Sequence, residues 1–140
     1  MRSACITYVS ELGWELIVPA DMAAHTDFIG RGALAAQREY GVRRRLVQLL
    51  LADPEAMAYH DEPLLRDGCP VGKVTSAAYG HTLGATVALA TVRDGGEVVT
   101  AQWLNSGSWS VVVAGTAVDA TLSLRPLYDP ASDRPNGRNT

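Results

Sequence analysis

Residues 63–74 read Pro-Leu-Leu-Arg-Asp-Gly-Cys-Pro-Val-Gly-Lys-Val, and this stretch decides the fold class. Apolar residues lie on both sides of Asp67-Gly68, a dipeptide that favours a two-residue hairpin turn because both of its positions tolerate positive φ. We therefore predict two antiparallel strands, Pro63–Leu65 and Val71–Val74, joined at this turn. Short strands connected in this way are typical of antiparallel β-proteins.

The neighbouring segments continue the β pattern on both sides of this hairpin. Apolar runs separated by Gly-containing turns predict further strands at Leu46–Leu51, Ala85–Val92, Trp109–Val113 and Val118–Leu124. One short helix is expected between the second and third of these runs, at Val98–Leu104. Short strands at this spacing favour a small antiparallel barrel. The predicted fold class is mainly β with one or two short helices, and residues 42–128 form the barrel domain.

The first 41 residues have a different pattern. Ile6–Val9 and Trp14–Val18 alternate like strands of a hairpin, within a segment that we place at residues 1–24. A connecting segment at residues 25–41 contains a helix at Gly30–Tyr40, which Gly41 is placed to cap. At the other end of the chain, residues 129–140 have Pro, Asn, Gly and Arg without an apolar anchor, and we expect this tail to be disordered.

Composition and charge exclude several classes of protein. The 140 residues are 47% hydrophobic with a formal net charge of −3, which argues against a nucleic-acid surface. No apolar run is long enough for a signal peptide or a membrane helix. Cys5 and Cys69 have no Cys or His neighbour at metal-ligand spacing, so they are expected to be free thiols in a reducing compartment. We expect a cytoplasmic protein, or one that is soluble inside an organelle and whose targeting segment is not present here, with no membrane partner.

Few residues are candidates for catalysis or for binding a metal or ligand. His25, His60 and His81 share no metal-ligand spacing, and no acid–base constellation is complete. The basic run Arg43-Arg44-Arg45 precedes the first barrel strand. It has two interpretations, a solvated strand start or a contact to phosphate or carboxylate groups.

The stretch around the first predicted hairpin is more informative. A loop of two or four residues centred between Glu11 and Leu12 would place Tyr8 opposite Glu15. Opposed residues project on one face with Cβ atoms about 5 Å apart, so a phenol and a carboxylate would stand side by side. Such a pair suits a pterin, because the carboxylate accepts two hydrogen bonds from the ring amide and amino groups. The alternative interpretation is a solvated cross-strand pair.

Several motifs in the same order resemble one known family. Residues 8–16, Tyr-Val-Ser-Glu-Leu-Gly-Trp-Glu-Leu, are similar to its Tyr-x-Gly-Glu-x-Gly-aromatic-Glu motif, and residues 28–34 to its Phe-Ile-Gly-Arg-Glu-Ala-Leu helix start. Residues 79–84 and 126–130 are similar to motifs of its C-terminal barrel. The family is the tetrahydrofolate-dependent aminomethyltransferases, that of the glycine cleavage T-protein. The variants present here look most like the dimethylglycine and sarcosine dehydrogenase branch.

The resemblance implies tetrahydrofolate binding and transfer of a one-carbon unit from an amine such as glycine, sarcosine or dimethylglycine to the folate. It places the pterin contacts on Tyr8 and Glu15, and makes residues 1–24 a remnant of the folate-binding domain ahead of the C-terminal barrel. FAD is implied only where a separate oxidoreductase domain exists. The implied partners are the folate, the folate and FAD domains, or a second copy of the chain.

The sequence also departs from the family pattern. Ser10 stands in place of a glycine and Gly32 in place of a glutamate, and only Ala20–Asp27 separate the first motif from the helix, where the family has a long stretch. The region of the family's catalytic aspartate has no counterpart. We therefore expect the chain alone to be inactive and to bind folate weakly. The alternatives are a non-catalytic interaction module or decayed remnant, and a methyl-transferring relative of the sulfonium demethylases.

Overall fold

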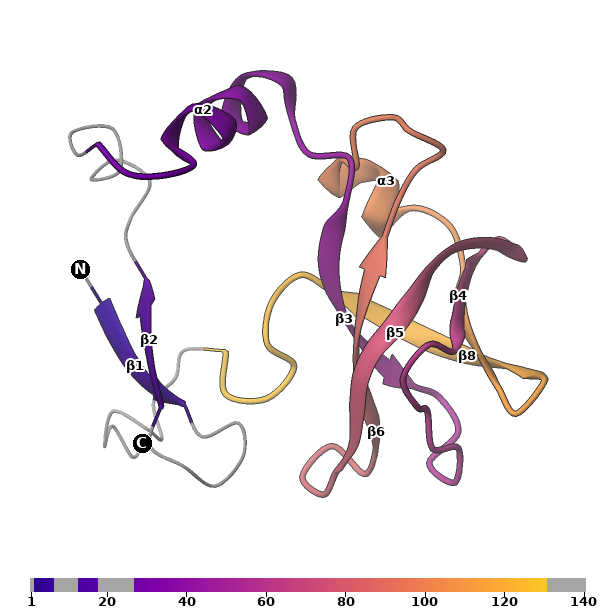
Figure 1. Ribbon diagram of the computed structural model, residues 1–140. Coiled ribbons are helices and arrows are strands. Elements are labelled where there is room, and N and C mark those ends of the chain that lie inside the picture. Colours follow the sequence, from indigo (N-terminus) through magenta and orange to yellow (C-terminus); the bar gives the residue numbers. More distant parts are fainter. Residues whose placement is uncertain (1, 7–12, 18–26, 131–140) are drawn as a thin grey trace. The chain divides into compact units, whose positions relative to one another are not determined.

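The computed structural model describes the backbone of residues 2–6 and 13–17 and all atoms of residues 27–130. The chain divides into two compact units, Met1–Tyr40 and Gly41–Thr140 (Figure 1). The disordered tail expected at residues 129–140 lies, from residue 131 on, outside the described residues. No helix within the described ranges is long and apolar enough to cross a bilayer.

The described residues of the first unit form a two-stranded ribbon and a helix. Strands β1 (Arg2–Ile6) and β2 (Gly13–Ile17) pair antiparallel. Helix α2 spans Arg31–Tyr40, within one residue of the predicted start, and none of its side chains is buried. Gly41 follows with φ +80°, the left-handed conformation that ends many helices and that glycine adopts at little cost.

The second unit (Figure 1) is a closed antiparallel barrel, and its strands pair in the order β3-β6-β5-β4-β7-β8. It confirms the predicted fold class, mainly β with a small antiparallel barrel and short helices. The strands are β3 (Arg45–Leu51), β4 (Pro63–Arg66), β5 (Cys69–Gly80), β6 (Ala85–Val92), β7 (Trp109–Val113) and β8 (Thr116–Ser123).

Alternating side chains of β3 supply the centre of the barrel. Val47, Leu49 and Leu51 are at most 2% exposed, whereas Gln48 and Leu50 between them are partly exposed. Leu49 stands opposite Ala88 of β6 on one side and Leu122 of β8 on the other. Pairing of β3 with β8 closes the barrel, and closure leaves no unpaired sheet edge.

The turns follow the predicted chemistry. Asp67 and Gly68 have φ of +50° and +78°, as a two-residue type I′ hairpin requires, and they join Arg66 to Cys69. A second tight turn joins β7 to β8 through Ala114 and Gly115, with φ of +48° and +85°. Ala114 has no glycine-like freedom, so its left-handed conformation costs about 1–2 kcal/mol that the closed barrel must offset.

Two elements, β5 and helix α3 (Ala101–Asn105), differ in length from the prediction by more than one residue. Strand β5 is much longer than Val71–Val74 because a bulge between Val74 and Ser76 lets it bend and continue along β6 to Gly80. Helix α3 begins later than the predicted Val98 because Thr100 caps it. The Thr100 side chain accepts a hydrogen bond from the Trp103 amide at 3.1 Å.

Candidate functional site

The predicted pterin pair is only partly described. Glu15 lies in β2, but its backbone partner is Ala4, and Trp14 pairs with Cys5. The register with a two- or four-residue loop is therefore wrong, because residues 7–12 connect the strands and the length of a hairpin loop sets the register. Tyr8 lies outside the described residues, so the proximity of Tyr8 and Glu15 stays a prediction.

The barrel has an exposed apolar surface formed by β3, β6 and β5, which we call the outer apolar face. The registers Leu46↔Thr91, Leu50↔Val87 and Ala78↔Val87 place outward-pointing residues of the three strands side by side. Leu46 is 57% exposed and Leu89 is 36% exposed. The outer apolar face consists of Leu46, Leu50, Ala78, Val87 and Leu89. Outward positions of an antiparallel strand are usually polar when they face solvent. These five are apolar, and the polar residues Gln48 and Thr91 lie among them.

A small depression borders this face. It has a volume of about 180 Å³ and is lined by Gln48, Val87, Leu127, Tyr128 and residues 80–83 of the β5–β6 turn. The Gln48 Oε1 atom accepts a hydrogen bond from the Leu127 amide at 2.6 Å, which fastens the segment after β8 to β3. The depression is smaller than typical ligand pockets of 300–1,000 Å³ and offers no complete folate site.

A polar cluster lies where the loop before β4 meets β5. His60 Nε2 lies 3.1 Å from an Asp61 carboxylate oxygen, and His60 Nδ1 lies 2.8 Å from the Thr75 carbonyl oxygen. The Lys73 ammonium pairs with the other Asp61 oxygen, and this hydrogen bond lowers the pKa of Asp61 below its ordinary value. The cluster is open to solvent, and its contacts hold the loop to the barrel.

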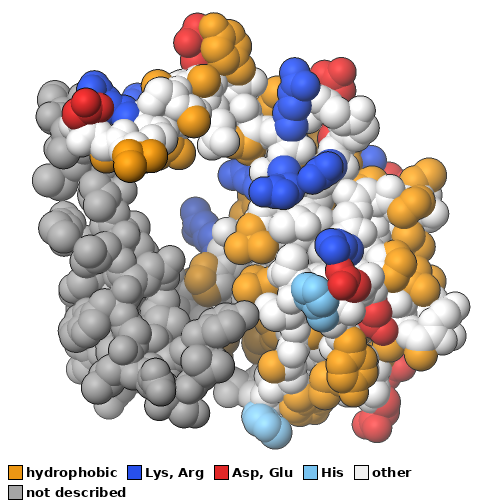
Figure 2. All heavy atoms as spheres, viewed as in Figure 1, with side chains coloured by type: hydrophobic (Ala, Val, Ile, Leu, Met, Phe, Trp, Pro, Cys, Tyr) orange, Lys and Arg blue, Asp and Glu red, His pale blue; other side chains and the backbone are white. Residues whose placement is uncertain are grey.

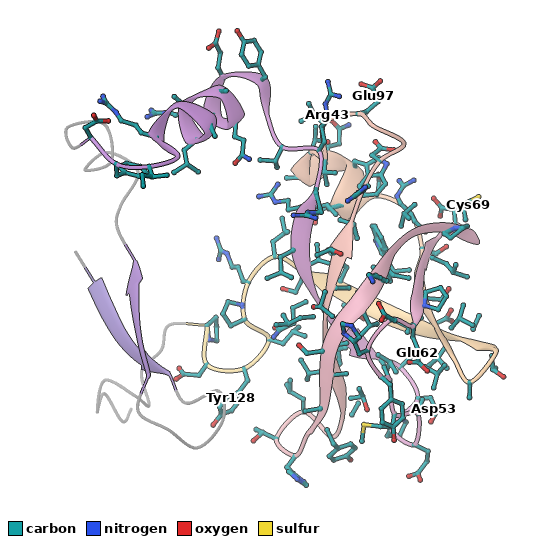
Figure 3. The ribbon with its side chains drawn as sticks, in the orientation of Figure 1. Arg43, Asp53, Glu62, Cys69, Glu97 and Tyr128 are labelled. Atoms are coloured by element: carbon teal, nitrogen blue, oxygen red, sulfur yellow. The ribbon has the colours of Figure 1, made fainter. Side chains whose placement is uncertain are left out.

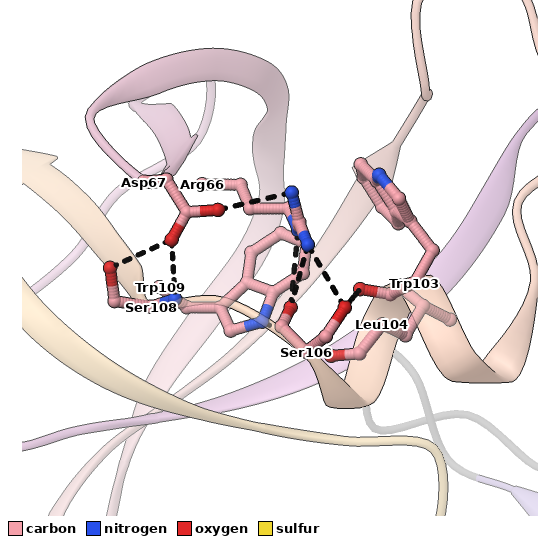
Figure 4. A network of polar contacts seen from close by, with 7 residues as sticks. All are labelled: Arg66, Asp67, Trp103, Leu104, Ser106, Ser108 and Trp109. Atoms are coloured by element: carbon pink, nitrogen blue, oxygen red, sulfur yellow. Dashed lines mark hydrogen bonds and ion pairs between the residues drawn. The ribbon is translucent and has the colours of Figure 1, made fainter.

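A second polar network, shown in Figure 4, joins the β4–β5 turn to the segment before β7. The Arg66 guanidinium donates to the Ser106 carbonyl and hydroxyl oxygens and pairs with Asp67 at 3.0 Å. Asp67 Oδ1 accepts from the amide of Ser108 at 2.8 Å and from its hydroxyl at 3.1 Å. Arg66 Cζ also lies 4.7 Å from the Trp103 ring centroid, a cation–π distance.

Two tryptophans anchor the same network in the core. The rings of Trp103 and Trp109 meet edge to face with centroids 5.5 Å apart. Trp109 is 6% exposed, and its indole N–H donates to the Leu104 carbonyl at 3.2 Å. The network therefore has a structural role. The turn dipeptide predicted only the hairpin, because nothing in the local sequence indicates that Ser108 is the partner of Asp67.

The first testable consequence concerns Asp67. Hydrogen bonds from Ser108 and the charge of Arg66 lower the pKa of Asp67, and a carboxylate with a depressed pKa stabilises the fold above its unfolded pKa of 3.8. That stability is lost as pH falls through the folded-state pKa. We expect Asp67→Asn to lower Tm at pH 6, with a difference that narrows below pH 3.8. Calorimetric Tm values from pH 2 to 6 test this, and a constant difference across the series would contradict it.

Within residues 27–130 no three His, Cys, Asp or Glu side chains gather to hold a metal ion. Cys69 is a free, exposed thiol at the start of β5, beside the β4–β5 turn (Figure 3). The described side chains thus belong to a closed antiparallel barrel domain with an exposed apolar face.

Comparison with known proteins identifies the family to which this domain belongs. Residues 44–129 match the family model of the glycine cleavage T-protein C-terminal barrel domain. The chain belongs to this family, as its motifs indicated. A structure of the glycine cleavage system aminomethyltransferase T from Bartonella henselae has the same fold, with a TM-score of 0.58 and 20% identity over 76% of this chain and 28% of that one.

Relatives with different names share this domain. The chain is 42% identical to an aminomethyltransferase of Synechococcus sp. (strain CC9902), over 84% of the chain and 29% of the relative. It is 33% identical to the mitochondrial sarcosine dehydrogenase of Mus musculus, over 79% of the chain and 12% of that relative. It is 38% identical to the mitochondrial pyruvate dehydrogenase phosphatase regulatory subunit of Mus musculus, over 72% of the chain and 13% of that relative. The chain spans less than a third of the length of these relatives.

Proposed function

We propose that this chain serves as the barrel domain of a tetrahydrofolate-dependent one-carbon transferase and works with a folate-binding domain rather than alone. Family membership and the aminomethyltransferase relative support the reaction class. The one-carbon donor in this proposal is a glycine-, sarcosine- or dimethylglycine-type amine. FAD enters only where a separate oxidoreductase domain supplies the oxidised amine. The free thiol of Cys69 fits a cytoplasmic location.

The observation that carries the proposal is the outer apolar face. Leu46 and Leu89 point away from a barrel that already has a complete core. Burying exposed apolar surface against a partner yields about 25 cal/mol per Å², so a face of this kind stabilises domain docking. The occupant that the family membership favours is a folate-binding domain. The same face and the first ribbon are the surfaces through which we expect the isolated chain to self-associate.

The pterin contacts in this proposal are Tyr8 and Glu15. A charged hydrogen bond contributes a net of about 1.5–3 kcal/mol. Association costs on the order of 4 kcal/mol or more. One open carboxylate contact therefore leaves little affinity, because a tight site surrounds its ligand on several sides. Catalysis and tight folate binding thus require walls that a neighbouring domain supplies.

We expect tetrahydrofolate to bind the purified chain with a Kd of about 1 mM or weaker, in keeping with that small net free energy. Calorimetric titration measures the affinity, and a discontinuous assay for methylene-tetrahydrofolate tests for turnover. Micromolar binding by a strictly monomeric chain would contradict the proposal. Light scattering of the same sample reports self-association.

A pair of variants locates the associating surface. Leu46→Lys places a charge on the outer apolar face, whereas Leu34→Lys places one on α2, where Leu34 is 53% exposed. Both changes add one positive charge at an exposed leucine. We expect Leu46→Lys to lower the association measured by light scattering and Leu34→Lys to leave it unchanged. Equal effects of the two variants would remove the outer apolar face from the proposal.

A second candidate function is a non-catalytic interaction module. The regulatory subunit among the relatives favours it, because that protein is named for regulation rather than catalysis. A folate-binding domain added in trans separates the two functions. If the chain acts in one-carbon transfer, the added domain forms a complex that binds folate more tightly than either part. If it is an interaction module, folate affinity stays unchanged while the barrel still binds a protein partner.

A further inference from the structure

A groove of about 650 Å³ lies at the end of the barrel where β3 begins and β6 ends. We call it the basic groove. Figure 2 shows Lys and Arg side chains gathered over this end of the barrel. The basic groove is lined by Arg44, residues 70–73 of β5, Thr91, Arg93 and the glycines Gly95 and Gly96.

The three cationic side chains of this groove come from three separate segments. The pair Arg45↔Val92 joins β3 to β6, so Arg44 and Arg93, the next residues outward, emerge at the same end of adjacent strands. The pair Lys73↔Thr91 joins β5 to the other side of β6 and adds the ammonium group. Strand pairing thus gathers charges that lie 29 and 20 residues apart in sequence, from 44 to 73 and from 73 to 93.

The two arginines of the groove differ from an arginine that supports the fold. Arg66 is held by Ser106, Asp67 and the Trp103 ring. The side chains of Arg44 and Arg93 make no hydrogen bond or ion pair with any residue in the described part of the chain, whereas the backbone amide of Arg93 donates to the Val71 carbonyl at 2.8 Å. Both guanidinium groups are therefore available to an external anion. The negative charge of Asp61 partly offsets the positive charge of Lys73. The groove keeps a net positive charge, because its lining has no acidic residue.

The walls of the groove complete its shape. Pro70 and Val71 supply apolar wall. Gly95 and Gly96, with φ of +50° and +106°, also line the groove, and they add no side chain to its wall. Apolar wall lowers the local dielectric constant and strengthens charge–charge attraction relative to open water. Asp94 and Glu97 flank the glycines, but neither lines the groove.

We propose that the basic groove binds a small polyanion that carries two or more carboxylate or phosphate groups. The guanidinium groups of Arg44 and Arg93 are planar forks that suit bidentate hydrogen bonds to either group, and Lys73 adds a compact charge. Of the two interpretations of the basic run at residues 43–45, this one selects the anion contact and assigns it to Arg44. The site is independent of the proposed folate function.

The test is a calorimetric titration of the full chain with pyrophosphate and, separately, with citrate. We expect one-to-one binding that weakens as sodium chloride is added, because salt screens exposed charges. Amide chemical shifts should move at Gly72, Gly95 and Gly96. Binding of pyrophosphate alone identifies phosphate as the ligand group, binding of citrate alone identifies carboxylate, and binding of both shows that the groove accepts either. Absence of binding by both would overturn the proposal.

Matched variants separate a site from diffuse surface charge. Arg44→Gln and Arg93→Gln should each weaken binding about tenfold, the change that corresponds to 1.4 kcal/mol. Arg43→Gln is the control, because Arg43 is exposed at the same end of the barrel (Figure 3) but does not line the groove. All three side chains are solvent-accessible, and circular dichroism verifies folding. If Arg43→Gln weakens binding as much as Arg44→Gln, the groove is not a site.

Discussion

Replacement of Leu49 by alanine should lower the free energy of unfolding by about 2–5 kcal/mol, the range for buried leucine-to-alanine changes. Leu49 is fully buried at the middle of β3, between β6 and β8, where the barrel closes. Its side chain fills space that neighbours from both strands cannot reach by small shifts, because closure limits how far the strands can relax. The free energy of unfolding of a small domain is about 5–15 kcal/mol in total, so this single change removes a large share of the stability.

The measurement is equilibrium denaturation in urea, with the midpoint and slope compared between variant and parent. Leu46→Ala is the matched control. It removes the same atoms from the same strand at a side chain that is 57% exposed. Its effect should stay within about 0.5 kcal/mol, as is usual for surface substitutions. Equal losses from the two variants would show that β3 does not alternate as described.

Replacement of Gly72 by alanine is expected to have a comparable effect for a different reason. A Cβ atom at Gly72 would lie 2.0 Å from the Thr91 carbonyl oxygen and 3.1 Å from the Val92 Cα atom. Both are backbone atoms of the neighbouring strand β6, so no side-chain rotation relieves the clash. Relief requires β5 to move from β6 at the pair Gly72↔Val92. Overpacking lowers the free energy of unfolding by about 1–3 kcal/mol where side chains can adjust. We expect Gly72→Ala to lower it by an amount at or above the top of that range.

The control for this change is Gly32→Ala in α2. Nothing lies within 4 Å of a Cβ atom at Gly32, and its backbone is helical. Alanine is favoured over glycine in a helix by about 1 kcal/mol, so this variant should gain helicity by circular dichroism. If Gly72→Ala unfolds at the same denaturant concentration as the parent, the close approach of β5 and β6 at this position is wrong.

The sequence determined the local elements of the barrel. Ala85–Val92 and Trp109–Val113 were predicted with the bounds that the structure has, because apolar runs ended by Gly-containing turns specify strands from neighbouring residues alone. The Asp67-Gly68 turn was predicted for the same reason, since its positive φ values depend on two residues. The family motifs correctly indicated the T-protein C-terminal barrel.

Only the tertiary structure decided which of these strands are neighbours. The closing pair of β3 and β8, the contact of Asp67 with Ser108, and the gathering of Arg44, Lys73 and Arg93 at one groove all join residues far apart in sequence. The ribbon register that pairs Glu15 with Ala4 also departed from the local prediction. A local pattern specifies which face of a strand is apolar, but not which strand lies beside it. That choice is made by burial of all the apolar faces at once, which no single segment encodes.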